Sequence, residues 1–250
     1  MGAAALRLLA VTRAEPDSVA PCTDRDSVLF VGRAAGLSRI KRAAPVWQRA
    51  AVPAFVYALS DPTIGAGDLP AFKGAVTPGD AAQTLRRAIR SQQASGTLGA
   101  RHVNELVDDV ARFVGLFSKV CGEEYVHVRL EALEDSCCVF WHQDCVDFRW
   151  VATYRGPCTE FVAPEWSKAV LRRRQADSKH AQGLTHSDVA LFKGRGETHD
   201  PTKLLDHPGI VHRSPRIEAA GICRSVLVPD IPQPWMFDGG GGGGGGGSDD

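Results

Sequence analysis

Two histidine–x–aspartate triplets, His142-Gln143-Asp144 and His186-Ser187-Asp188, have residue types and a spacing suited to metal binding. In an extended chain, side chains two positions apart point to the same face, so the imidazole and the carboxylate can bind one ion. A histidine from a later strand would complete a set of two histidines and one carboxylate. Such a set leaves coordination positions open and is the ligand pattern of non-haem iron(II) sites.

The positions of the two triplets in the chain favour the first one. His142 is followed by several expected strands and by further histidines, so enough chain remains to supply a third ligand. Asp188 directly precedes the apolar segment 189–192, where a carboxylate is typical of a turn that starts a strand. Either pair could instead make only local hydrogen bonds. We therefore place the candidate site at His142 and Asp144.

Helices are expected before this site. Residues 80–93 are rich in alanine and arginine and contain no proline or glycine, and residues 101–120 place apolar side chains at helical spacing on one face. Gly122 stands where a helix stop is expected. The preceding region, 1–79, is broken by repeated prolines and is expected to be irregular, with a short strand or buried turn at 28–31.

After Gly122 the apolar pattern alternates, which indicates strands. One further helix is expected at 166–175. Helices followed by many short strands indicate an α+β chain, in which N-terminal helices back a β-barrel or jelly roll at residues 80–236. Residues 237–250 contain nine consecutive glycines and are expected to be a disordered tail. The expected strands are 125–130, 138–142, 148–154, 189–192 and 225–228.

Composition excludes some classes of function. Lys plus Arg and Asp plus Glu both number 29, so the basic excess of a general nucleic-acid binder is missing. The local cluster 172–174 is expected to be a solvated helix face. No apolar run is long enough to cross a bilayer, so a soluble protein that does not enter the membrane is expected.

The seven cysteines do not form a disulfide framework by their spacing, which favours a reducing intracellular compartment such as the cytoplasm. The N-terminal segment contains Arg7 and Arg13 and no acidic residue before Glu15, which leaves an organelle transit peptide as an alternative.

Three segments of the chain carry a family resemblance. Residues 138–162 resemble a signature in which an FHxD-like element is followed by an arginine and a TYxGPGT-like stretch; 187–194 and 211–215 resemble a GDVALxKG-like strand and an HRSP element. In this order, the blocks resemble domain-of-unknown-function family 1826 over roughly residues 100–230. Two positions depart from the pattern. Trp141 stands where phenylalanine is usual, and Cys158 replaces a glycine, which restricts the turn.

The family has no assigned activity, but its order of motifs is similar to that of double-stranded β-helix (jelly-roll, cupin-like) oxygenases that use iron(II) and 2-oxoglutarate. By that resemblance, His142, Asp144 and His212 would bind iron. The third ligand could instead be His199 or His207.

The resemblance also implies a co-substrate pocket. Arg224 begins the last expected strand, and its planar guanidinium could pair with the distal carboxylate of 2-oxoglutarate through two parallel hydrogen bonds. Tyr154 and Arg149 are expected to line the same pocket. The alternatives are a surface salt bridge for Arg224 and a place in the barrel wall for Tyr154.

The sequence thus predicts an iron(II)-dependent dioxygenase that uses 2-oxoglutarate. A non-redox, cupin-like protein that binds zinc or iron is the first alternative, because Cys137, Cys138 and Cys145 near the motif would suit zinc. An interaction scaffold without catalysis is the second. The substrate, a small molecule or a protein, is not defined by the sequence.

Overall fold

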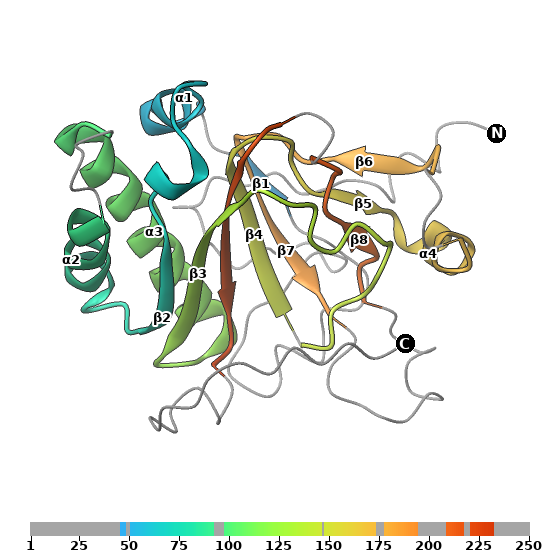
Figure 1. Ribbon diagram of the computed structural model, residues 1–250. Helices are drawn as coiled ribbons and strands as arrows, with labels where there is room; N and C mark the ends of the chain where they lie inside the picture. The colour runs from blue at the N-terminus through green and yellow to red at the C-terminus, as the bar shows by residue number, and fades with distance from the viewer. Residues whose placement is uncertain are drawn as a thin grey trace, which may run out of the picture.

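Two antiparallel sheets with a helical layer on one side make up the described part of the chain (Figure 1). The computed structural model describes residues 46–48, 51–92, 98–146, 148–173, 178–194, 209–217 and 221–232. The predicted strand or turn at 28–31 and the glycine-rich tail lie outside these residues.

Three helices form the layer: α1 (Ala54–Leu59), α2 (Ala81–Gln92) and α3 (Ala100–Cys121). The two longer ones confirm the helices predicted at 80–93 and 101–120. The helix α3 buries its apolar stripe, and it ends at Gly122, whose φ of 70° is the left-handed conformation that glycine adopts without strain. A 3-10 turn, η3 (Ala66–Asp68), follows α1.

The larger sheet has the strand order β1-β7-β4-β9-β3-β2, and all its neighbours are antiparallel. The strands β1 and β2 come from the proline-rich region expected to be irregular, and β2 pairs along its length with β3. The strand bounds are β1 Val46–Gln48, β2 Phe72–Val76, β3 Val126–Leu133, β4 Phe148–Arg155, β7 Asp188–Lys193 and β9 Arg224–Asp230.

The smaller sheet has the order β6-β5-β8 and consists of very short strands, β5 (Glu160–Val162), β6 (Ala181–Gly183) and β8 (His212–Arg213). The helix α4 (Pro164–Leu171) begins two residues before the predicted residue 166 and ends before the predicted residue 175. Its Val170 packs with Trp141, Val162 and Val211 in a small apolar cluster.

Alternation along β4 gives the larger sheet two different faces. Trp150 and Tyr154 point to the helical layer, where the rings of Phe113 and Phe117 meet Trp150 edge to face. Val151 instead belongs to a second apolar cluster, on the side of the smaller sheet. The space between the two sheets is therefore separate from the main core.

The fold class α+β with N-terminal helices behind the sheet is confirmed, whereas the described strands form two sheets and no closed barrel. The strand predicted at 138–142 is wrong. Cys138 has a φ of 54°, and in this segment His142 alone forms a β-bridge, to His212. An extended run is incompatible with that left-handed residue.

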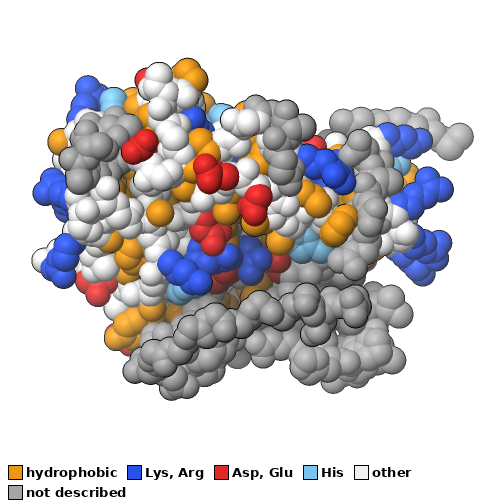
Figure 2. Space-filling model, viewed as in Figure 1, with side chains coloured by type: hydrophobic (Ala, Val, Ile, Leu, Met, Phe, Trp, Pro, Cys, Tyr) orange, Lys and Arg blue, Asp and Glu red, His pale blue; other side chains and the backbone are white. Residues whose placement is uncertain are grey.

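No helix in the described ranges is long and apolar enough to cross a membrane. Figure 2 shows Lys and Arg side chains projecting at the edge of the molecule where α4 lies. Arg172 and Arg173, which follow α4, are both exposed, in agreement with a solvated basic surface.

Candidate metal centre

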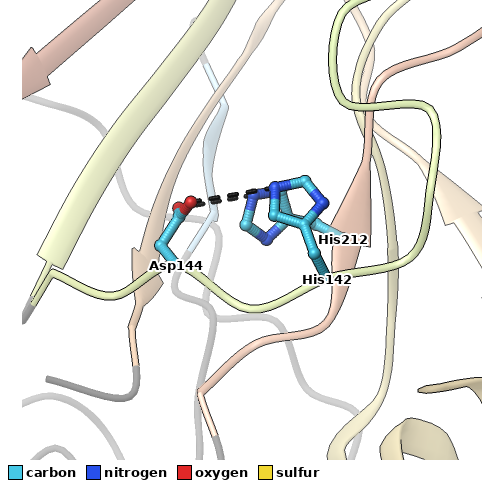
Figure 3. Close-up of side chains that lie close together, drawn as sticks. All are labelled: His142, Asp144 and His212. Carbon is cyan, nitrogen blue, oxygen red and sulfur yellow. Dashed lines mark ion pairs between the residues drawn. The ribbon is translucent and has the colours of Figure 1, made fainter. Parts of the chain in front are cut away.

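A reciprocal pair of backbone hydrogen bonds holds the two histidines of the candidate site together. The amide of His142 donates to the carbonyl of His212, and the amide of His212 donates to the carbonyl of His142, both at 3.0 Å. Their ring centroids lie 4.5 Å apart. The loop before β4 and the strand β8, which are distant in the sequence, therefore present two imidazoles side by side (Figure 3).

The carboxylate of Asp144 points toward both rings (Figure 3). Its Oδ2 lies 3.3 Å from Nε2 of His212, and its Oδ1 lies 3.8 Å from Nε2 of His142. One ligand atom from each of the three residues lies within 4.8 Å of the others. The structure thus brings together the three residues predicted to bind a metal.

Hydrogen bonds fix which imidazole nitrogens face the carboxylate. Nδ1 of His142 lies 2.8 Å from the carbonyl oxygen of Phe140, and Nδ1 of His212 lies 3.0 Å from that of Ile210. A carbonyl oxygen can only accept, so in both hydrogen bonds Nδ1 carries the proton. In the neutral rings, Nε2 then has a free lone pair.

Burial strengthens this assignment for His212. Removal from water lowers the pKa of His212 to about 4, against the opposing effect of the nearby Asp144 carboxylate. The ring is therefore neutral at pH 7, so its Nε2 and the Oδ2 of Asp144 are two acceptors facing each other.

These atoms fit a bound cation. Oδ2 of Asp144 is buried and has no hydrogen-bond partner among the described residues. A buried carboxylate oxygen without a hydrogen bond beside an imidazole lone pair is unfavourable, and a cation between them would stabilise both. Two imidazole nitrogens and one carboxylate oxygen are donors that suit divalent iron or zinc.

A cavity of about 210 Å³ lies between the two sheets and is lined by His142 and His212. Arg224, at the start of β9, lines the same cavity and is only 3% exposed. Thr159 and Ser214, whose roles the sequence analysis did not predict, also lie on its wall. Phe192 stacks on the His212 ring, with centroids 4.8 Å apart.

The Arg224 guanidinium has only neutral partners among the described residues. It donates to the carbonyl of Pro157 and to the hydroxyls of Thr159, Ser214 and Thr153, at 2.9, 2.7, 3.1 and 3.4 Å respectively. Burial lowers its pKa to about 10, a value at which it is still charged at pH 7. The surface salt bridge considered as an alternative for Arg224 is therefore wrong.

Arg149 also lines the cavity, as predicted, and contacts Asp144 directly. Its Nη1 donates to Oδ1 of Asp144 at 2.6 Å, and its Nε donates to Oδ1 of Asp230 at 2.9 Å. Arg149 lies five residues from Asp144 in the chain but 81 residues from Asp230, so only the fold brings the three groups together.

Tyr154 is not in the cavity wall, which corrects the prediction that it lines the pocket. Alternation along β4 turns its side chain to the helical layer, where the hydroxyl donates to Asp109 at 2.7 Å and the ring meets Phe55. Tyr154 is fully buried there and belongs to the main core.

The second triplet makes hydrogen bonds outside the candidate centre. Nε2 of His186 lies 2.8 Å from the carbonyl oxygen of Gly156, and Oδ2 of Asp188 accepts from the amide of Thr185 at 2.8 Å. Asp188 therefore supports the turn before β7, as its position predicts. The other candidate third ligands, His199 and His207, lie outside the described residues.

Two of the three cysteines near the motif, Cys137 and Cys138, line the cavity. A hydrogen bond to Asp135, together with burial, raises the pKa of the Cys137 thiol to about 11. Cys145 is exposed.

The sequence matches the family described as protein of unknown function (DUF1826) over residues 34–230. The chain belongs to this family. No curated protein matches it. The matched range contains the three residues of the candidate metal centre and Arg224. It also begins well before residue 80, in agreement with the pairing of β1 and β2 into the larger sheet.

Proposed function

We propose that this chain is an iron(II)-dependent dioxygenase that uses 2-oxoglutarate and has a double-stranded β-helix fold. Two antiparallel sheets support this proposal, because a His-Asp-His group that could hold a metal and a buried arginine lie between them. His142, Asp144 and His212 would hold the iron. The bound iron and 2-oxoglutarate would supply the redox chemistry that activates dioxygen.

The observation that carries the proposal is the burial of the Arg224 guanidinium among neutral partners. Arg224 is 3% exposed, and its guanidinium has only neutral partners among the described residues. It lines the same cavity as the two histidines of the His-Asp-His group. A buried charge without a counter-ion is unfavourable, so an anionic ligand would be stabilised there. Four of the five N–H groups of Arg224 have acceptors among the described residues, so one remains to donate to the carboxylate of a dicarboxylate whose other end lies at the metal.

Other residues of the cavity have assignable tasks. The hydroxyls of Thr159 and Ser214 fix the guanidinium of Arg224 in the wall. Val226 and Val228, together with Phe192, give the cavity an apolar side that excludes water from the ligand. The substrate would enter from the open side of the cavity.

Calorimetry with 2-oxoglutarate and iron-loaded protein under anaerobic conditions tests this function. We expect 2-oxoglutarate to bind the wild type. Arg224→Ala should weaken this binding by about 2–5 kcal/mol, the usual cost of removing one partner of a buried charge pair. The metal content should not change, because Arg224 is not part of the His-Asp-His group.

Arg155→Ala is the matched control. Arg155 is also a buried arginine, but it donates to the carbonyl of Ile64 and does not line the cavity. If the wild type does not bind 2-oxoglutarate at millimolar concentration, the proposed function is refuted. If Arg224→Ala and Arg155→Ala bind it equally well, the role of Arg224 is refuted.

A zinc-binding protein without redox chemistry is the second candidate. Cys137 and Cys138 in the cavity wall favour it, because thiolates are good zinc ligands. The metal content of protein purified without chelators or affinity metal distinguishes the two candidates, since the first expects iron and the second zinc.

A further inference from the structure

Arg149 lies between two carboxylates, one of which belongs to the candidate metal centre. Its Nη1 donates to Oδ1 of Asp144 at 2.6 Å, and its Nε donates to Oδ1 of Asp230 at 2.9 Å. The Arg149 side chain is 26% exposed, whereas those of Asp144 and Asp230 are 6% and 8% exposed. The guanidinium thus bridges the site and the larger sheet.

The far end of this bridge is anchored in regular structure. Asp230 is the cross-strand partner of Arg149 in the pairing of β4 with β9. Its second oxygen, Oδ2, accepts from Arg129 at 3.1 Å, and Arg129 in turn donates to Glu131 at 3.2 Å. Because three neighbouring strands carry these groups, the position of the Arg149 guanidinium is fixed by the sheet.

We infer that Arg149 is a positioning residue for Asp144, an inference that rests on the proposed metal site. The guanidinium takes Oδ1 of Asp144 and leaves Oδ2 without a hydrogen bond, facing Nε2 of His212. Oδ1 is thereby bonded to the protein, and Oδ2 is left to bind the metal. Arg149 orients the carboxylate in this way before the metal binds.

Two effects of Arg149 on metal affinity have opposite signs. A positive charge next to the ligand repels a metal ion, so removal of the charge alone would tighten binding. Removal of a group that orients a metal ligand typically weakens binding by about 10–100-fold. Positioning is the stronger effect here, because the hydrogen bond to Asp144 is short and its anchor is rigid.

The test uses Co(II), an air-stable probe whose visible absorption reports on its ligands. The metal-free full chain and its Arg149→Met variant are titrated with Co(II). We expect the variant to bind about 10–100-fold more weakly and to show altered absorption bands. Arg149→Lys should recover part of the affinity, because lysine keeps one donor for Asp144.

Two further variants separate positioning from general effects. Arg149→Met leaves the Asp230 carboxylate without one of its partners, and the variant could fail to fold for that reason alone. The double variant Arg149→Met with Asp230→Asn also removes this carboxylate, so it tests the inference if Arg149→Met does not fold. Arg86→Met is the matched control, because Arg86 makes an exposed ion pair with Asp108 on the helical layer. It should bind Co(II) like the wild type, with unchanged absorption bands.

The outcomes distinguish this inference from the proposed function. If the wild type binds no Co(II), the metal site fails and the inference fails with it. If the wild type binds Co(II) and the folded Arg149 variants bind equally well or more tightly, the positioning role alone is overturned. Weaker binding with altered bands in the Arg149 variants, and not in Arg86→Met, supports it.

Discussion

At the scale of single residues, the candidate centre depends on two imidazoles whose backbones hold each other. His142 and His212 form a reciprocal β-bridge, and the hydrogen bonds of their Nδ1 atoms turn both Nε2 atoms toward Asp144. This arrangement reduces the entropy lost when a metal binds, because the ligands are already close to one another.

His142→Ala should abolish the stabilisation of the protein by metal. A ligand that binds only the folded state at 100 times its dissociation constant adds about 2.7 kcal/mol, or about 5–10 °C in melting temperature for a chain of this size. Melting curves with and without Zn(II) measure this shift. His186→Ala is the control, because His186 is not part of the His-Asp-His group, and it should keep the shift.

An equal shift in His142→Ala and wild type, at equal metal content, would remove His142 from the site. Loss of the shift in His186→Ala alone would move the site to the second triplet.

At the scale of elements, the turn between β4 and β5 positions Arg224. Gly156 in this turn has a φ of 77°, and a Cβ on it would lie 3.2 Å from the carbonyl oxygen of Cys223 and 3.3 Å from Cα of Arg224. The close approach of this turn to the start of β9 therefore needs glycine. It also explains why the guanidinium can reach Pro157 and Thr159, which follow in the same turn.

Gly156→Ala should destabilise the protein by at least about 1–2 kcal/mol, the cost of the left-handed conformation for a residue with a side chain. Gly115→Ala is the matched control. Gly115 lies inside α3 with open space around its Cβ position, so alanine should stabilise the protein by about 0.5–1 kcal/mol. Urea unfolding measures both changes. A shift of the same sign in both variants would contradict the role given to the Gly156 turn.

The elements differ in how well the sequence predicts them. The helix α3 is long and strongly periodic, and its prediction is nearly correct at both ends. The short strands β1, β2, β5 and β6 were not predicted, because a few residues carry little pattern and pairing with neighbours decides their conformation.

The segment 138–142 shows why an apolar run can mislead. Val139, Phe140 and Trp141 are typical strand residues, but Trp141 is fully buried in the cluster beside α4, with the guanidinium of Arg213 over its ring. Tertiary packing overrides the local preference there.

The same limit applies to the site. Residue types, spacing and position in the chain select His142 and Asp144, and the family resemblance adds His212, whereas the contact of Arg149 with Asp144 depends on the fold.

At the scale of the whole molecule, a metal ion in this centre would link the two sheets. His212 belongs to the smaller sheet, and Asp144 is tied through Arg149 to Asp230 in the larger one. The larger sheet is also covered by the helical layer (Figure 1). The smaller sheet has strands of two or three residues and depends more on such a link.

Removal of metal with a chelator should therefore loosen the two sheets unequally. Amide hydrogen exchange in β5, β6 and β8 should become faster, because local opening has a low free energy where few hydrogen bonds hold a strand. Exchange in β3, β4 and β9 should stay unchanged, since these strands lie inside the larger sheet. Mass spectrometry of the exchanged peptides measures both. A uniform acceleration, or none in the smaller sheet, would contradict this link.

The strand order of the larger sheet has a consequence for biosynthesis. The strand β9 is the last described strand of the chain, yet it lies between β3 and β4 and pairs with both. During translation the larger sheet therefore remains in two halves, with the edges of β3 and β4 unpaired until residues 224–230 leave the ribosome. Unpaired edges invite pairing with other chains, so we expect the nascent protein to be most open to aggregation over this interval. Arg224 belongs to this strand, so the wall of the cavity is completed only when β9 has been synthesised.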